Sequence, residues 1–150
     1  MRTAVAAIFL IAGVGSAAAG QSSSGLWNYH FQNGIGQYST GSWGSGTGGA
    51  LGLACQDNGN VSILTEIKGK AAPGGSRFTL TTSSRAGSRA HSFTTGQDGS
   101  LTLRANSPAF RSLWADIRAR DTVTLRYAGG ETQVLSLAGA KKMLPATPCG

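Results

Sequence analysis

Charged residues are scarce in this chain of 150 residues. Its 13 lysines and arginines and 6 aspartates and glutamates make up 13% of the sequence, against roughly 25% in a typical globular protein. The shortage argues against a coiled coil, a long helical bundle and a disordered acidic tail. The 23 glycines are about twice the usual share. The composition is typical of one compact, turn-rich β domain.

Motifs for catalysis are also missing. The sequence has no G-x-S-x-G elbow for a serine nucleophile, and three of its six carboxylates, Asp57, Asp98 and Glu131, lie in or beside predicted turns. Two cysteines and two histidines, His30 and His91, are too few and too scattered to indicate a metal site. Residues 44–49 match G-x-G-x-x-G, but a strand pattern follows where a dinucleotide site needs a helix. We predict no catalytic residue, no metal and no cofactor.

The N-terminus has the pattern of an export signal. Arg2 precedes an apolar stretch at residues 4–14, and small residues precede Gly20. An uncleaved membrane anchor is the alternative, but a span needs about 20 apolar residues and this stretch is shorter. We predict a signal peptide at residues 1–19 and a flexible linker at 20–26. No other segment is long enough to cross a membrane.

Both cysteines, Cys55 and Cys149, fall in the predicted mature chain, which carries a net charge of +6. In an oxidising compartment an isolated pair is most simply one disulfide. Two free thiols are the alternative. A bridge closing so long a loop would stabilise the fold by ~4–5 kcal/mol. We therefore expect a periplasmic or secreted protein.

Alternating apolar and polar residues, separated by turn signals, indicate one β-rich domain over residues 27–150. The clearest case is Asn60–Ile67, which follows an Asn-Gly turn. Lys68–Ser76 is predicted to be a loop and Ser83–Gly87 a turn. The predicted strands are Trp27–Phe31, Gln37–Trp43, Ala50–Gln56, Asn60–Ile67, a strand around Phe78 and Leu80, His91–Thr95, Ser100–Arg104, Thr122–Tyr127 and Glu131–Leu137.

Residues 108–118 are predicted to form one amphipathic helix. Ser107 is a suitable N-cap and Pro108 suits the first helical position. The apolar stripe at helical spacing consists of Phe110, Leu113, Trp114 and Ile117. A short C-terminal helix is expected at Ala138–Leu144. The predicted fold is mainly β: a small antiparallel β-sandwich or open barrel with these two helices.

Two groups of residues are candidate binding surfaces. Trp27, Tyr29 and Phe31 share one face of the first strand, which we interpret as a core face; stacking on sugar rings or docking a partner is the alternative. The stretch holding the second group contains no carboxylate, and its members are Arg77, Arg85, Arg89 and His91. A further basic group comprises Arg104, Arg111, Arg118, Arg120 and Arg126.

Arginine binds phosphate and carboxylate in a bidentate fork. A basic surface on an exported protein is suited to an anionic envelope polymer or an acidic envelope protein. A solvated face that only keeps the protein soluble is the alternative. Nucleic acid is not an expected partner, because few aromatic residues lie among the arginines.

Three segments resemble small proteobacterial periplasmic proteins, including accessory proteins of type VI secretion. They are Trp27, then Leu51–Cys55 with the strand Val61–Ile67, and the ending Val134–Gly139 with Leu144 and Cys149. The resemblance implies a periplasmic β domain with a disulfide from a strand to the C-terminus and no catalytic residues.

We therefore expect a non-enzymatic binding or accessory protein of the cell envelope. An inhibitor of, or immunity protein against, an envelope hydrolase is the second hypothesis. Because inhibitors of basic lysozymes need acidic surfaces, this second role would require an acidic target. A small hydrolase is the third hypothesis.

Overall fold

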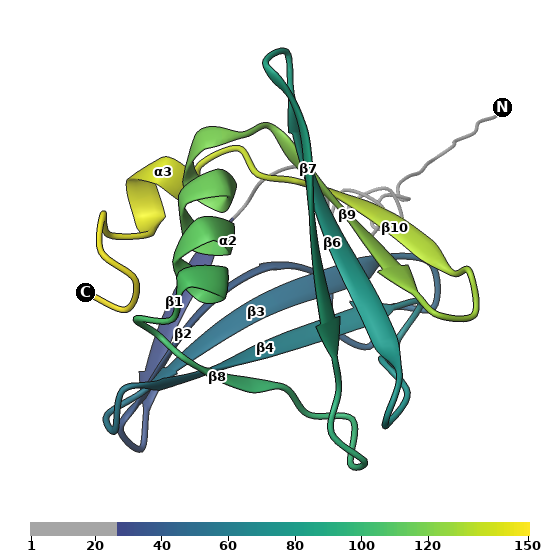
Figure 1. Cartoon of the computed structure of the whole chain (residues 1–150), viewed down its shortest axis with the longest axis horizontal. Helices are drawn as coiled ribbons and strands as arrows, with labels where there is room; N and C mark the ends of the chain where they lie inside the picture. Colours follow the sequence, from purple (N-terminus) through teal and green to yellow (C-terminus); the bar gives the residue numbers. More distant parts are fainter. Residues whose placement is uncertain (1–26) are drawn as a thin grey trace, which may run out of the picture.

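In the computed structural model, residues 27–150 are described, and they form two antiparallel sheets packed face to face (Figure 1). The first sheet has the order β1-β2-β3-β4-β5, with β8 also paired to β4. Its strands are β1 (Asn28–Gln32), β2 (Ile35–Gly41), β3 (Gly49–Gln56), β4 (Asn60–Ile67), β5 (Lys70–Ala71) and β8 (Thr102–Arg104). The signal peptide and linker predicted for residues 1–26 lie outside the described residues.

The second sheet has the order β10-β9-β6-β7. Its strands are β6 (Arg77–Ser84), β7 (Gly87–Thr94), β9 (Thr122–Tyr127) and β10 (Thr132–Ser136). Helix α2 (Pro108–Ala119) covers one end of the space between the sheets, and the short α3 (Ala140–Met143) packs against α2 (Figure 1). The fold is a small β-sandwich, one of the two architectures that the sequence pattern predicts.

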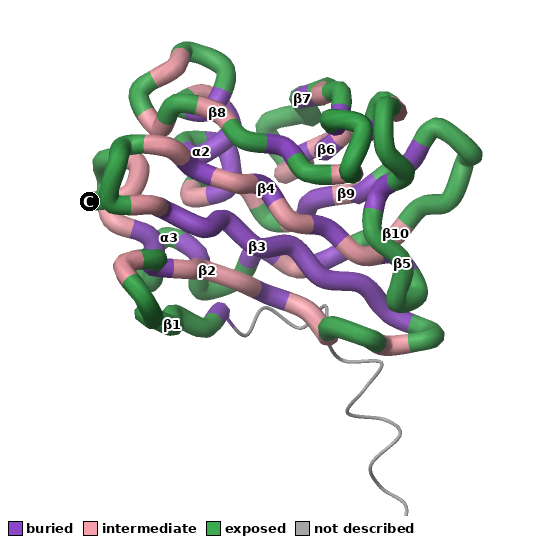
Figure 2. Tube along the Cα trace, turned by 90° about the horizontal axis from the view of Figure 1, so that it is seen from below, coloured by how far each residue is buried: buried purple, intermediate pink, exposed green. Residues whose placement is uncertain are grey.

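The core lies between the sheets, and the strand patterns explain it. On β4, Val61, Ile63, Thr65 and Ile67 are buried while the intervening residues are partly exposed, as the alternation predicts. Strand β3 is buried along nearly its whole length (Figure 2). Its outer face carries small residues, and Trp43 lies so close to Gly52 that a Cβ there would meet the indole ring at 3.1 Å.

Helix α2 confirms the predicted cap and apolar stripe. The Ser107 hydroxyl accepts a hydrogen bond from the amide of Phe110. The stripe is buried, with exposures of 1% or less; its members are Phe110, Leu113, Trp114 and Ile117. This face holds α2 against the end of the sandwich, because leaving it in water would expose four large apolar side chains.

Several predicted boundaries differ from the structure. The predicted loop at Lys68–Ser76 contains β5, and the predicted turn at Ser83–Gly87 shrinks to two residues because β6 and β7 extend into it. Cross-strand hydroxyl pairing between Ser83 and Ser88 supports that extension (2.8 Å). Serine-rich sequence favours turns locally, but pairing with a neighbouring strand outweighs that preference here.

Candidate functional site

The predicted basic group does not form one surface. Arg77 begins β6 and Arg85 follows its other end, which places their Cα atoms roughly 25 Å apart along an extended strand. Arg89 and His91, on β7, meet instead at Asp116 of α2. The stretch has no carboxylate of its own, but the fold supplies one from a distant helix.

Asp116 is the centre of what we call the Asp116 cluster, formed by Asp116, His91, Arg89 and Arg120. Nε2 of His91 lies 2.8 Å from Oδ2 of Asp116, and both side chains are buried. Nε of Arg89 lies 3.5 Å from the same oxygen, and Nε of Arg120 lies 3.7 Å from Oδ1. Three basic side chains thus share one carboxylate, which ties β7 to α2.

The Asp116 cluster does not contain a nucleophile paired with a base. Within residues 27–150, His91 forms its side-chain hydrogen bond with Asp116 alone, and the Ser112 hydroxyl accepts one from Arg89. No group of His, Cys, Asp and Glu in this part of the chain could hold a metal ion. The cluster's geometry therefore supports a structural role in positioning α2.

Asp116→Ala is expected to lower the free energy of unfolding by about 2–3 kcal/mol, because it leaves His91 buried without its partner and separates α2 from β7. Urea unfolding monitored by circular dichroism measures the loss. Asp121→Ala is the matched control, since Asp121 is exposed and forms no salt bridge; it should change stability by about 0.5 kcal/mol or less. Equal losses in the two variants would contradict the role assigned to the cluster.

The predicted core face of the first strand is confirmed at Trp27 and wrong at Tyr29 and Phe31. Trp27 is buried, but Tyr29 and Phe31 are 48% and 64% exposed. Pairing of Tyr29 with Tyr38 and of Phe31 with Gly36 places them on the inner face of the first sheet. Strand β1 is exposed throughout because it lies at the sheet edge, beyond the area that the second sheet covers (Figure 2).

These rings line a cavity of about 410 Å³, which we call the aromatic groove. Its walls include Tyr29, Phe31, Tyr38 and the disulfide Cys55–Cys149, with Gln56 and Asp57 at the polar side. Gly36 forms part of the floor, and any Cβ there would lie 2.7 Å from the Tyr29 hydroxyl. The absent side chain lets the Tyr29 ring lie down over the sheet.

An aromatic series connects the groove to the core. The ring centroids of Tyr29 and Tyr38 are 4.7 Å apart, and Tyr38 meets Trp114 edge-on at 5.6 Å. Burial, with a smaller contribution from nearby Tyr29, raises the pKa of the Tyr38 hydroxyl above its ordinary value. A tyrosine hydroxyl is uncharged at neutral pH even at its ordinary pKa, so the groove presents neutral ring faces.

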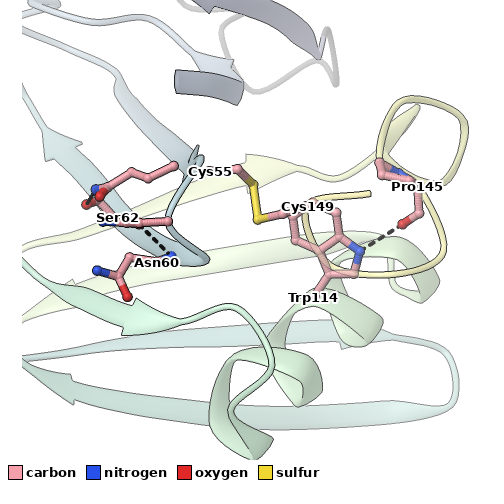
Figure 3. The surroundings of a disulfide bond; sticks show 8 residues. Cys55, Asn60, Ser62, Trp114, Pro145 and Cys149 are labelled. Carbon is pink, nitrogen blue, oxygen red and sulfur yellow. Dashed lines mark hydrogen bonds between the residues drawn. A yellow bond between two sulfur atoms is a disulfide. The ribbon is translucent and has the colours of Figure 1, made fainter. Parts of the chain in front are cut away.

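The C-terminal segment closes the groove on one side. Cys149 is bonded to Cys55 of β3, and the indole Nε1 of Trp114 donates to the carbonyl of Pro145 at 2.8 Å (Figure 3). The Arg118 side chain also donates to the carbonyl of Leu144. The predicted disulfide is confirmed, and it indicates an oxidising, extracytoplasmic environment. No helix within residues 27–150 has the length and apolarity that crossing a bilayer requires.

A family model matches residues 25–144, four-fifths of the sequence. The chain belongs to the YfjT family. The match includes β1, β2 and α2, and so most of the aromatic groove, but it ends before Cys149. No curated protein and no solved structure matches the chain. The YfjT name states no activity, so the resemblance to type VI accessory proteins stays a prediction.

Two features were not predicted from the sequence: the role of Asp116 as the centre of an ion-pair cluster, and the exposure of the rings in the aromatic groove. Asp116 lies four residues after Ser112 and four before Arg120, next to the apolar stripe of α2. A carboxylate at the border of such a stripe is a usable sign of a buried ion pair. The exposure of Tyr29 and Phe31 had no comparable sign, because their alternation is the same whether or not a second sheet covers them.

Proposed function

We propose that this YfjT protein is a secreted or periplasmic, non-enzymatic binding protein of the cell envelope, and that its aromatic groove holds sugar rings of an anionic envelope polymer. The observation that carries the proposal is the exposure of Tyr29 and Phe31 in a cavity beside the disulfide. Large aromatic side chains are normally buried, and a pair left open in a concave site is suited to ligand contact.

The polar residues at the groove support a saccharide as its occupant. The carboxylate of Asp57 and the amide of Gln56 adjoin the rings, and such groups bind hydroxyls while aromatic faces stack on the apolar faces of sugars.

The charge distribution supports an anionic polymer as the whole ligand. Residues 27–150 carry a net charge of +6, and every salt bridge among them involves Asp116. Ten lysines and arginines in this part of the chain therefore have no carboxylate within 4.0 Å: Lys68, Lys70, Arg77, Arg85, Arg104, Arg111, Arg118, Arg126, Lys141 and Lys142. Cations whose charge no carboxylate neutralises attract a polyanion from a distance.

Replacing Tyr29 and Phe31 together by alanine should lower affinity for isolated envelope polysaccharide about tenfold, since each lost stacking contact costs about 0.5–1.5 kcal/mol. Co-sedimentation of the disulfide-bonded protein with the polysaccharide measures retention. Val134→Ala is the matched control, because Val134 is 50% exposed on β10 of the other sheet; it should bind normally.

Two outcomes would contradict the proposal. Unchanged retention of the double variant would show that the aromatic groove does not bind the polysaccharide. Retention that disappears when the envelope fraction is treated with protease would point to a protein ligand, as expected for an inhibitor or immunity protein.

A further inference from the structure

A second cavity of about 410 Å³ is lined in part by the C-terminal segment, and we call it the α2 groove. Its walls come from α2, from the turn that precedes the helix and from residues 146–148. Trp114 lines the α2 groove and meets Tyr38, which lines the aromatic groove. The two cavities are therefore neighbours, and the segment that the disulfide holds lines both of them.

Besides Trp114, whose indole N–H donates to Pro145, three side chains with hydrogen-bond donors line the α2 groove: Arg111, Asn106 and Thr147. All three residues are exposed. None of these side chains forms a hydrogen bond or salt bridge with another residue of the described chain. Arg111 contrasts with Arg89, Arg118 and Arg120, whose side chains are all held by protein acceptors.

The remaining walls leave space beside these donors. Ala115 and Pro148 are small or compact, and the volume is in the range of small-ligand sites. No carboxylate lines the cavity, so nothing in its wall opposes a negative ligand. An unpaired guanidinium with an amide and a hydroxyl beside it matches an oxyanion, which accepts hydrogen bonds at several oxygens.

We propose that the α2 groove is an anion site, in which Arg111 binds the phosphate or carboxylate group of a sugar and Asn106 and Thr147 donate to its remaining oxygens. This inference deepens the proposed function by naming where the ligand's anionic group is held, and it rests on that proposal only for the identity of the polymer. The wall is preformed, because Trp114 holds Pro145 and the disulfide holds Cys149.

The test is an NMR titration of the disulfide-bonded protein with glucose 6-phosphate, with oligogalacturonate and with neutral glucose. Either anionic probe should shift the NMR signals of the Arg111 side chain and of the amides near Asn106 and Thr147. The probe that binds more tightly shows whether the site prefers a phosphate or a carboxylate. Arg111→Gln should weaken that binding about tenfold, as expected for loss of a charge-assisted bidentate contact. Thr147→Val should weaken it severalfold.

Arg126→Gln is the matched control, since Arg126 is exposed on β9 and forms no salt bridge. The inference would be overturned by equal losses in the Arg111 and Arg126 variants, by glucose binding as well as the anions, or by perturbations spread over the surface without saturation. The double variant at Tyr29 and Phe31 should still bind glucose 6-phosphate. Failure of the anion site and failure of the aromatic groove are therefore separately visible.

Discussion

Replacing Cys55 and Cys149 together by alanine is expected to lower the free energy of unfolding by about 4 kcal/mol. The disulfide joins residues 94 positions apart, and a loop of that length loses much of its conformational entropy in the unfolded chain when it is closed. Alanine is the suitable replacement because Cys55 is buried in the core, where a serine hydroxyl would lack a partner.

Urea unfolding of the double variant and of the unmodified protein under strong reductant measures this effect. The double variant and the reduced protein should lose similar free energies of unfolding relative to the oxidised protein, because both lack the same covalent bond. If the reduced protein unfolds at the same urea concentration as the oxidised one, the stabilising role of the bridge is wrong. Both samples should also bind anions more weakly in the α2 groove, since residues 146–148 lose their tether at Cys149.

Trp114→Ala is expected to cost about 3–5 kcal/mol, the usual range for removing a buried aromatic side chain. Trp114 is 1% exposed, packs against Phe110 and Tyr38, and donates to Pro145. Trp114→Phe is the control: it keeps most of the packing and loses the hydrogen bond, so it should cost about 1–2 kcal/mol.

Trp114 and the disulfide hold the same segment, so their effects should not add. In the variant without cysteines, Trp114→Ala should cost measurably less than in the unmodified protein, because part of the Pro145 contact is already lost. A double-mutant cycle from urea unfolding gives the coupling. Strictly additive losses would show that the segment is held by each contact independently.

The local sequence was sufficient to predict the buried face of an element wherever only one of its faces was apolar. In Asn60–Ile67 a shift by one residue would turn four core side chains to solvent, so the alternation alone fixes the buried face. Helix α2 is similar, since its cap and stripe agree. In the β6–β7 hairpin the serines favoured a longer turn, and only pairing with the neighbouring strand decided where the turn begins.

The sequence by itself determined a mainly β domain, helix α2 and a single possible cysteine pair, because periodicity, capping and the number of cysteines are properties of the chain alone. The choice of a sandwich over an open barrel came from the structure. The tertiary structure decided which surfaces are open and which charges meet. Tyr29 and Phe31 are exposed because the second sheet ends before β1. Arg89 and His91 find Asp116 because α2 packs on β7, and such contacts depend on how distant elements are placed in space.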